Sequence, residues 1–162
     1  MWDSLIKILN RATSAITMLF LVVMVLIIFL QIISRAVIGS SFAWTEELAR
    51  FLMIWVIFLG AGMAFQYASH ISVDSLVERL SVKAKKIVHI FIALCSISLF
   101  LVMLVTGWEI TNKMMVQKSP AMRLPMGYVY AVIPISAVLQ ILNIIDTTKK
   151  YLFKGKRVQE EV

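Results

Sequence analysis

The sequence predicts an all-α membrane protein with four transmembrane helices, and two observations support this fold class. First, four stretches lack Asp, Glu, Lys and Arg: residues 12–34, 51–69, 87–108 and 124–145, with 23, 19, 22 and 22 residues. A helix of about 20 apolar residues crosses a hydrocarbon core about 30 Å thick. Second, the apolar runs are continuous, whereas the strands of a membrane β-barrel would alternate. Residues 1–162 are therefore expected to form a single membrane domain.

The basic residues predict how this domain is oriented. Eleven of the 16 Lys and Arg residues lie in the N-terminal segment, the second connection and the C-terminal tail, and five lie in the other two connections. The positive-inside rule then places both termini in the cytoplasm, with residues 146–162 as a basic cytoplasmic tail. The net charge of +7 is thus explained by topology and by anionic lipid headgroups, and we expect no nucleic-acid partner.

Residues 1–11, before the first uncharged stretch, are compatible with two structures. Trp2, Leu5, Ile6 and Leu9 follow helical spacing, and polar residues take the opposite face, as in a short amphipathic helix at the membrane interface. The alternative is a first transmembrane helix that begins earlier.

The first connection is expected to break at Gly39 and then to start a helix outside the membrane. Thr45 is a suitable N-cap, and Glu46 and Arg50 are spaced i, i+4 in the favourable order. In the second connection, Ser72 could cap another amphipathic interfacial helix. In the last stretch, Pro134 should kink the helix.

The sequence offers no chemistry of its own. The uncharged stretches contain no Asp, Glu, Lys or Arg, and His89 is their only histidine, which argues against ion transport by this chain alone. We expect His70 and His89 to be interfacial residues and not haem ligands. Without metal-spaced His and Cys residues or a phosphate-binding loop, we predict no catalytic residue, cofactor or metal, and no enzyme.

Polar and small residues inside the stretches are candidates for helix–helix contacts. Gln31 and Arg35 share a face, and either Gln31 forms an interhelical hydrogen bond or both reach the lipid headgroups. Gly60 and Gly62 allow close approach of another helix, either within this chain or from another chain. Trp55 lies about one turn inside the second stretch.

Several of these residues also form a pattern that extends over about residues 12 to 145. Their order and spacing resemble the DctQ-type small membrane subunit of tripartite ATP-independent periplasmic (TRAP) transporters, except that Ser136 stands where the family often has glycine. The matching residues are Gln31 and Arg35; Trp44-Thr45-Glu46-Glu47-Leu48-Ala49-Arg50; Leu59-Gly60-Ala61; His70, Ile71, Val73 and Asp74; Ser119-Pro120-Ala121; Leu124-Pro125; Tyr128 or Tyr130; and Pro134.

The resemblance implies a role in secondary, sodium-driven solute uptake across a bacterial inner membrane. The expected partners are a large multi-spanning membrane subunit, a periplasmic binding protein that docks transiently, and membrane lipids. The expected solute is an organic acid such as a dicarboxylate, keto acid or sialic acid. The alternative function is a stand-alone four-helix exporter acting as a homodimer, which the missing buried carboxylate disfavours.

Two sets of candidate residues follow. The subunit-interface candidates are Gln31, Arg35, Trp44, Glu46, Glu47, Arg50, Trp55, Gly60, Gly62, His70, Asp74 and Pro134. The docking candidates are Lys113, Lys118 and Arg123, three bases in the outer loop region near a single acid, Glu109. The alternative for these bases is a solvated rim.

Overall fold

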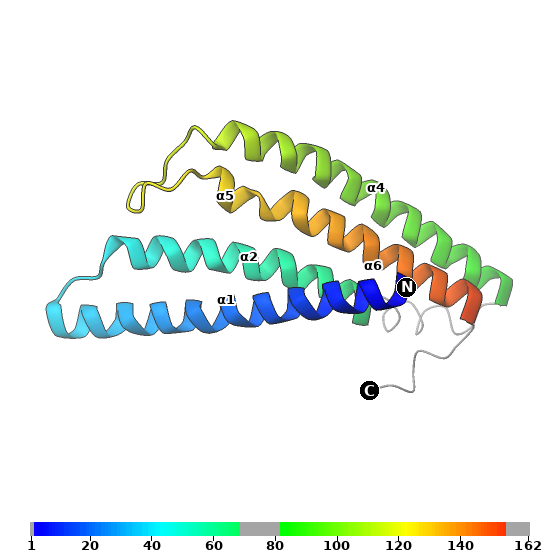
Figure 1. Cartoon of the computed structure of the whole chain (residues 1–162), viewed down its shortest axis with the longest axis horizontal. Helices are drawn as coiled ribbons and strands as arrows, with labels where there is room; N and C mark the ends of the chain where they lie inside the picture. The colour runs from blue at the N-terminus through cyan, green and yellow to red at the C-terminus, as the bar shows by residue number, and fades with distance from the viewer. Residues whose placement is uncertain (1, 69–81, 155–162) are drawn as a thin grey trace.

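The computed structural model describes residues 2–68 and 82–154, and these residues are helical apart from their connections (Figure 1). The helices are α1 (Trp2–Ile38), α2 (Ala43–Ala68), α4 (Val82–Met114), α5 (Gly127–Tyr130) and α6 (Val132–Lys154). His70, Asp74 and the interfacial helix expected after Ser72 lie outside the described residues.

The long helices lie in a row. Helix α1 packs against α2, α2 against α6, and α6 against α4, which gives the order α1–α2–α6–α4 across the molecule (Figure 1). The α1–α2 and α4–α5 connections lie at one end, called the loop end here, and the start of α1 and the end of α6 lie at the other, called the terminal end. The two loops predicted to share one side of the membrane are therefore neighbours.

Helix α1 is continuous over 37 residues. Nothing in the sequence breaks it, because residues 2–38 contain neither Gly nor Pro. It ends at Gly39, which has a φ of 77° and donates its N–H to the carbonyl of Arg35 at 3.1 Å; this left-handed termination favours glycine. Of the two alternatives for residues 1–11, the unbroken helix agrees with an earlier start of the first long helix.

The face of α1 that packs in the row has a regular pattern. Its buried residues are Ile6, Asn10, Thr13, Thr17, Ile27 and Ser34. Phe20, Met24 and Gln31 are partly exposed and complete an alternation of three- and four-residue steps. Such spacing is typical of helices that cross at a small angle, and Phe20 contacts Trp55 of α2 edge to face at 5.8 Å between ring centroids.

Helices α4 and α6 meet at the other edge of the row. Phe100, Ala137 and Ile144 form a buried apolar cluster between them. Their close approach requires Gly107, where a Cβ would lie 2.7 Å from Cγ2 of Ile133.

The predicted kink near Pro134 takes the form of a break. Helix α5 ends at Tyr130 and α6 begins at Val132. Pro134 has no N–H, so the usual i+4 bond to the carbonyl of Tyr130 cannot form. The bonds on either side remain, from Ala131 to Gly127 at 2.9 Å and from Ile135 to Ala131 at 3.3 Å. The interruption thus lies one turn before the proline.

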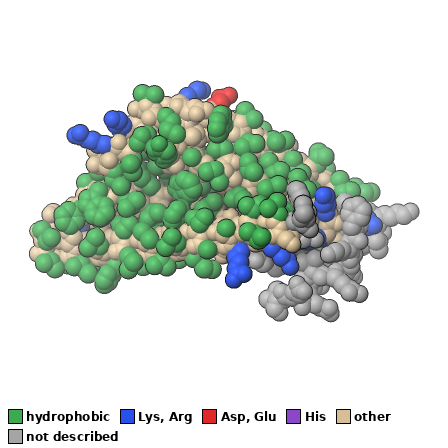
Figure 2. Space-filling model, in the orientation of Figure 1, with side chains coloured by type: hydrophobic (Ala, Val, Ile, Leu, Met, Phe, Trp, Pro, Cys, Tyr) green, Lys and Arg blue, Asp and Glu red, His purple; other side chains and the backbone are tan. Residues whose placement is uncertain are grey.

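The surface of the row is largely apolar. In the part of the chain that the structure describes, three helical segments are long and apolar enough to cross a membrane: Ser4–Ile38, Lys86–Met114 and Gly127–Lys150. Figure 2 shows apolar side chains over the middle of one face and basic side chains toward its ends and edges. Only 11% and 6% of the most apolar windows of the first two segments are buried, against 44% for the third, because the first two form the edges of the row. That residues 51–69 form a further crossing stays a prediction.

Candidate subunit interface

The start of α2 carries the acidic motif and connects it to a distant loop. The carboxylate atom Oε2 of Glu47 accepts the backbone N–H of Ala121 at 3.0 Å and of Met122 at 2.7 Å. Its neighbour Glu46 instead forms an exposed ion pair with Arg50 at 2.9 Å, as the i, i+4 spacing predicted. The two adjacent acids therefore have different roles, one between elements and one within α2.

Thr45 is not the N-cap that the sequence predicted. Helix α2 begins two residues earlier, at Ala43, and the fully buried Thr45 hydroxyl donates to the carbonyl of Phe42 at 2.6 Å. The Thr45 hydroxyl thus stabilises the first turn of α2 by a side-chain hydrogen bond to the residue that precedes the helix. Burial explains the difference, because a threonine hydroxyl that is shielded from water bonds to the nearest backbone acceptor.

The loop held by Glu47 is a tight hairpin over residues 117–126, called the basic hairpin here. The N–H of Met126 donates to Gln117 at 2.8 Å, and Ser119 donates its N–H to Leu124 at 2.9 Å. The Ser119 hydroxyl accepts a hydrogen bond from the N–H of Leu124 at 3.1 Å. Lys118 and Pro125 form an isolated antiparallel β-bridge. The hairpin is therefore closed by its own backbone and anchored to α2 by Glu47.

A buried polar junction joins three helices near the terminal end. The side-chain amide of Asn10 in α1 donates to Oδ1 of Asn143 in α6 at 2.9 Å, and Nδ2 of Asn143 donates to the carbonyl of Gly62 in α2 at 3.0 Å. Gln140 lies one turn before Asn143 and is also buried. A Cβ at Gly62 would lie 3.5 Å from Cγ of Gln140, so Gly62 makes its close approach within this chain.

This junction was not among the expectations drawn from the sequence, although a signal was present. Gln140, Asn143 and Asp146 recur every three residues in an otherwise apolar segment, which puts them on one face of a helix. All three are buried. Asp146 lies on the same helix face and forms an ion pair with Lys150, in which Oδ2 and Nζ are 2.5 Å apart. The expectation of an interhelical hydrogen bond was drawn for the amide of Gln31 alone and not for the amides of this segment.

Helix α2 also has one exposed stripe, called the outer stripe here: Glu46, Arg50, Met53, Ile57 and Gly60. The first four are exposed and Gly60 is partly so. A Cβ at Gly60 would meet no atom within 4 Å, in contrast to Gly62. The steps of four and three residues suit a helix from another chain, and Gly60 would allow it close approach.

The remaining interface candidates divide into internal and outward-facing residues. Trp55 packs on Phe20 within the chain, and Pro134 is buried in the row. Arg35 and Trp44 are exposed, and Gln31 is partly exposed at the edge of the α1–α2 contact. Among the described residues, no side-chain hydrogen bond involves Gln31 or Arg35.

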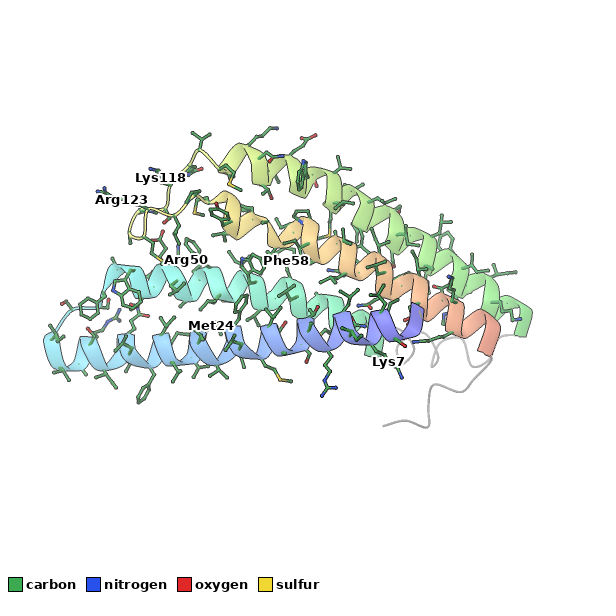
Figure 3. The ribbon with its side chains drawn as sticks, viewed as in Figure 1. Lys7, Met24, Arg50, Phe58, Lys118 and Arg123 are labelled. Atoms are coloured by element: carbon green, nitrogen blue, oxygen red, sulfur yellow. The ribbon has the colours of Figure 1, made fainter. Side chains whose placement is uncertain are left out.

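The three docking candidates also lie in different surroundings. Lys113 pairs with Glu109 of its own helix at 3.7 Å. Figure 3 shows Lys118 and Arg123 on the basic hairpin, with side chains that point away from the helices. In the described part of the chain, no group of three or more His, Cys, Asp or Glu side chains could hold a metal ion.

Comparison with known proteins places this arrangement in a family. The family model described as tripartite ATP-independent periplasmic transporters, DctQ component, matches residues 24–152. A putative TRAP transporter small permease protein of Haemophilus influenzae is 29% identical over 161 residues, which cover 96% of this chain and 99% of that protein.

Two larger relatives match over only part of their length. The isethionate TRAP transporter permease protein DctMQ of Oleidesulfovibrio alaskensis is 31% identical over 110 residues, 67% of this chain and 17% of that protein. The sialic acid TRAP transporter permease protein SiaT of Haemophilus influenzae is 25% identical over 130 residues, 80% of this chain and 21% of that protein. The matches thus span about a fifth of each of these permeases.

Proposed function

This chain belongs to the DctQ component family of tripartite ATP-independent periplasmic transporters, and we propose that it braces a large permease subunit rather than carrying a solute itself. The observation that carries this proposal is the open row of helices. Its edge helices bury few of their apolar side chains within the chain, and the amides of its buried polar junction bond to one another and to the backbone. Uncovered apolar helix faces are suited to packing against a large permease subunit, and an open row does not enclose a solute path across the membrane.

The proposed topology has four crossings, with α2 as the second, in a bacterial inner membrane. The grouping of both loops at one end supports the antiparallel order (Figure 1). The excess of basic residues in the segments at the terminal end then places that end in the cytoplasm. The loop end accordingly faces the periplasm.

The proposed contact with the large subunit combines the outer stripe of α2 with Gln31 and Arg35 of α1. Gly60 has open space around it, and Gln31 lacks a partner among the described residues. An amide in hydrocarbon gains from a hydrogen bond that a second chain supplies. The two larger relatives support the pairing, because a stretch similar to this chain is part of a longer permease in each.

The proposed activity is sodium-driven uptake of an organic acid delivered by a periplasmic binding protein. The relatives named for isethionate and sialic acid transport support an anionic organic solute. The alternative of a stand-alone exporter gains no support from the comparisons.

Co-purification in mild detergent tests the proposed contact. Gln31→Leu, Arg35→Ala and Gly60→Leu together should lower recovery of the large subunit about tenfold, the effect of about 1.4 kcal/mol on an equilibrium constant. Normal recovery with this triple variant would contradict the proposed interface.

A matched control changes the same kinds of residue on the far edge of the row. Ser98→Leu, Thr106→Leu and Lys113→Ala alter three exposed residues of α4. This variant should recover the large subunit as the unmodified chain does. Equal losses in both variants would point to general destabilisation and would count against a specific contact.

A further inference from the structure

The side chain of Gln140 is buried beside the polar junction, and its amide needs a partner there. Gln140 is 3% exposed and lies on α6, one turn before Asn143. Among the described residues, no side-chain hydrogen bond involves Gln140, whereas the oxygen and the nitrogen of the Asn143 amide are both bonded. Burial of an amide without a hydrogen bond is unfavourable, and buried polar groups in native proteins almost always have a partner.

Gly62 leaves room next to the Gln140 side chain. Helices α2 and α6 are neighbours in the row (Figure 1), and Gly62 is buried. Beyond the nearby backbone of α2, a Cβ at Gly62 would meet one described atom within 4 Å, Cγ of Gln140 at 3.5 Å, which is an ordinary contact. At Gly107 and Gly127, by comparison, a Cβ would lie 2.7 Å and 2.6 Å from the nearest atom. The α2–α6 contact therefore has space for a methyl group at Gly62, and a water molecule is of similar size.

The surroundings of this space decide which class of ligand it suits. Asp146, on the same face of α6, is already paired with Lys150, so its charge is compensated and does not attract a cation. A side chain from another chain does not reach an amide on a residue that is 3% exposed. A water molecule is small and neutral, and it both donates and accepts hydrogen bonds, as the amide of Gln140 does.

We propose that an ordered water molecule binds between α2 and α6 at Gly62, held by the amide of Gln140 and by Oδ1 of Asn143. This oxygen accepts from Asn10 and has a second lone pair for the water. Residues three apart on a helix lie on one face, so a single water contacts both amides. The water extends the three-helix junction along α6. The inference concerns the interior of this chain and does not rest on the proposed function.

Nuclear magnetic resonance of the full-length chain in lipid nanodiscs, with ¹⁵N-labelled glutamine side chains, tests the site directly. Magnetisation should pass from water to the side-chain NH₂ of Gln140, whose signal is assigned by its loss in Gln140→Met. The transfer should disappear in Gly62→Ala, because the added methyl group takes the space of the water. Gln117, which is exposed on the basic hairpin, is the positive control and should show the transfer in both chains.

A double-mutant cycle measures the same site through stability. Gly60→Ala is the matched control, because a Cβ there meets no atom within 4 Å; it should lower the unfolding equilibrium constant about threefold through helix propensity. Gly62→Ala should instead raise this constant about threefold, since it displaces the water and leaves the Gln140 amide unbonded. In a Gln140→Met background, which keeps an unbranched side chain without the amide, Gly62→Ala should be stabilising like the control.

Three results would overturn the site. The first is the absence of transfer from water to Gln140 in the unmodified chain, or its persistence in Gly62→Ala. The second is equal stabilisation by Gly62→Ala with and without the Gln140 amide, which is the behaviour of a dry space. The third is a transfer that needs sodium and is lost when choline replaces it, which would indicate a bound cation. None of these measurements uses the large subunit, so the proposed function is tested separately by co-purification.

Discussion

At the scale of single residues, Asn143 shows how one amide joins three helices. Its oxygen accepts from Asn10 and its nitrogen donates to Gly62, both within 3.0 Å. Asn143→Leu would leave the Asn10 amide without this acceptor in a buried site. We expect a loss of about 1–2 kcal/mol in the free energy of unfolding, measured by denaturation of the purified chain in detergent.

The double variant Asn10→Leu with Asn143→Leu provides the control for this prediction. Replacing both partners by apolar groups removes both members of the Asn10–Asn143 hydrogen bond, so the double variant should be less destabilised than the sum of the two single variants. Additive losses would show that the two amides do not interact.

At the scale of elements, the sequence predicts those boundaries that follow from the backbone alone. Gly39 ends α1 because the chain there takes a positive φ, and Pro134 interrupts the last helix because it lacks an N–H. The start of α2 and the role of Thr45 depend on burial, which composition does not report. The partners of Glu47 are 74 and 75 residues away, so no local pattern could identify them.

The order of the helices in the row can be tested by cross-linking. In a Cys95→Ser background, cysteines at positions 20 and 55 should link readily, because the two native rings are 5.8 Å apart. Cysteines at positions 20 and 100 should not, since Phe100 lies in the α4–α6 cluster at the other edge. Linking of the second pair in the monomeric chain would show that the row closes into a bundle.

At the scale of the whole molecule, the open row explains why some interface candidates make contacts within the chain and others face outward. A middle helix such as α2 has residues that contact other parts of the chain and exposed residues that do not. Glu47 bonds to the basic hairpin and Gly62 to Asn143 of α6, whereas Arg50 is exposed and a Cβ at Gly60 would meet no atom within 4 Å. The sequence could identify the motif but not this division, which depends on which helices are neighbours.

The orientation of the row decides which side of the membrane the basic hairpin faces. In intact cells, with Cys95 replaced by serine, a membrane-impermeant maleimide should label Lys118→Cys on the basic hairpin. It should label Lys7→Cys, near the terminal end (Figure 3), only after the membrane is opened. The unmodified chain is the control, because Cys95 is exposed within the chain but lies mid-helix in α4, where hydrocarbon should exclude the reagent. Labelling of Lys7→Cys in intact cells would reverse the topology, and the two cations of the hairpin would then face the cytoplasm, out of reach of any periplasmic protein.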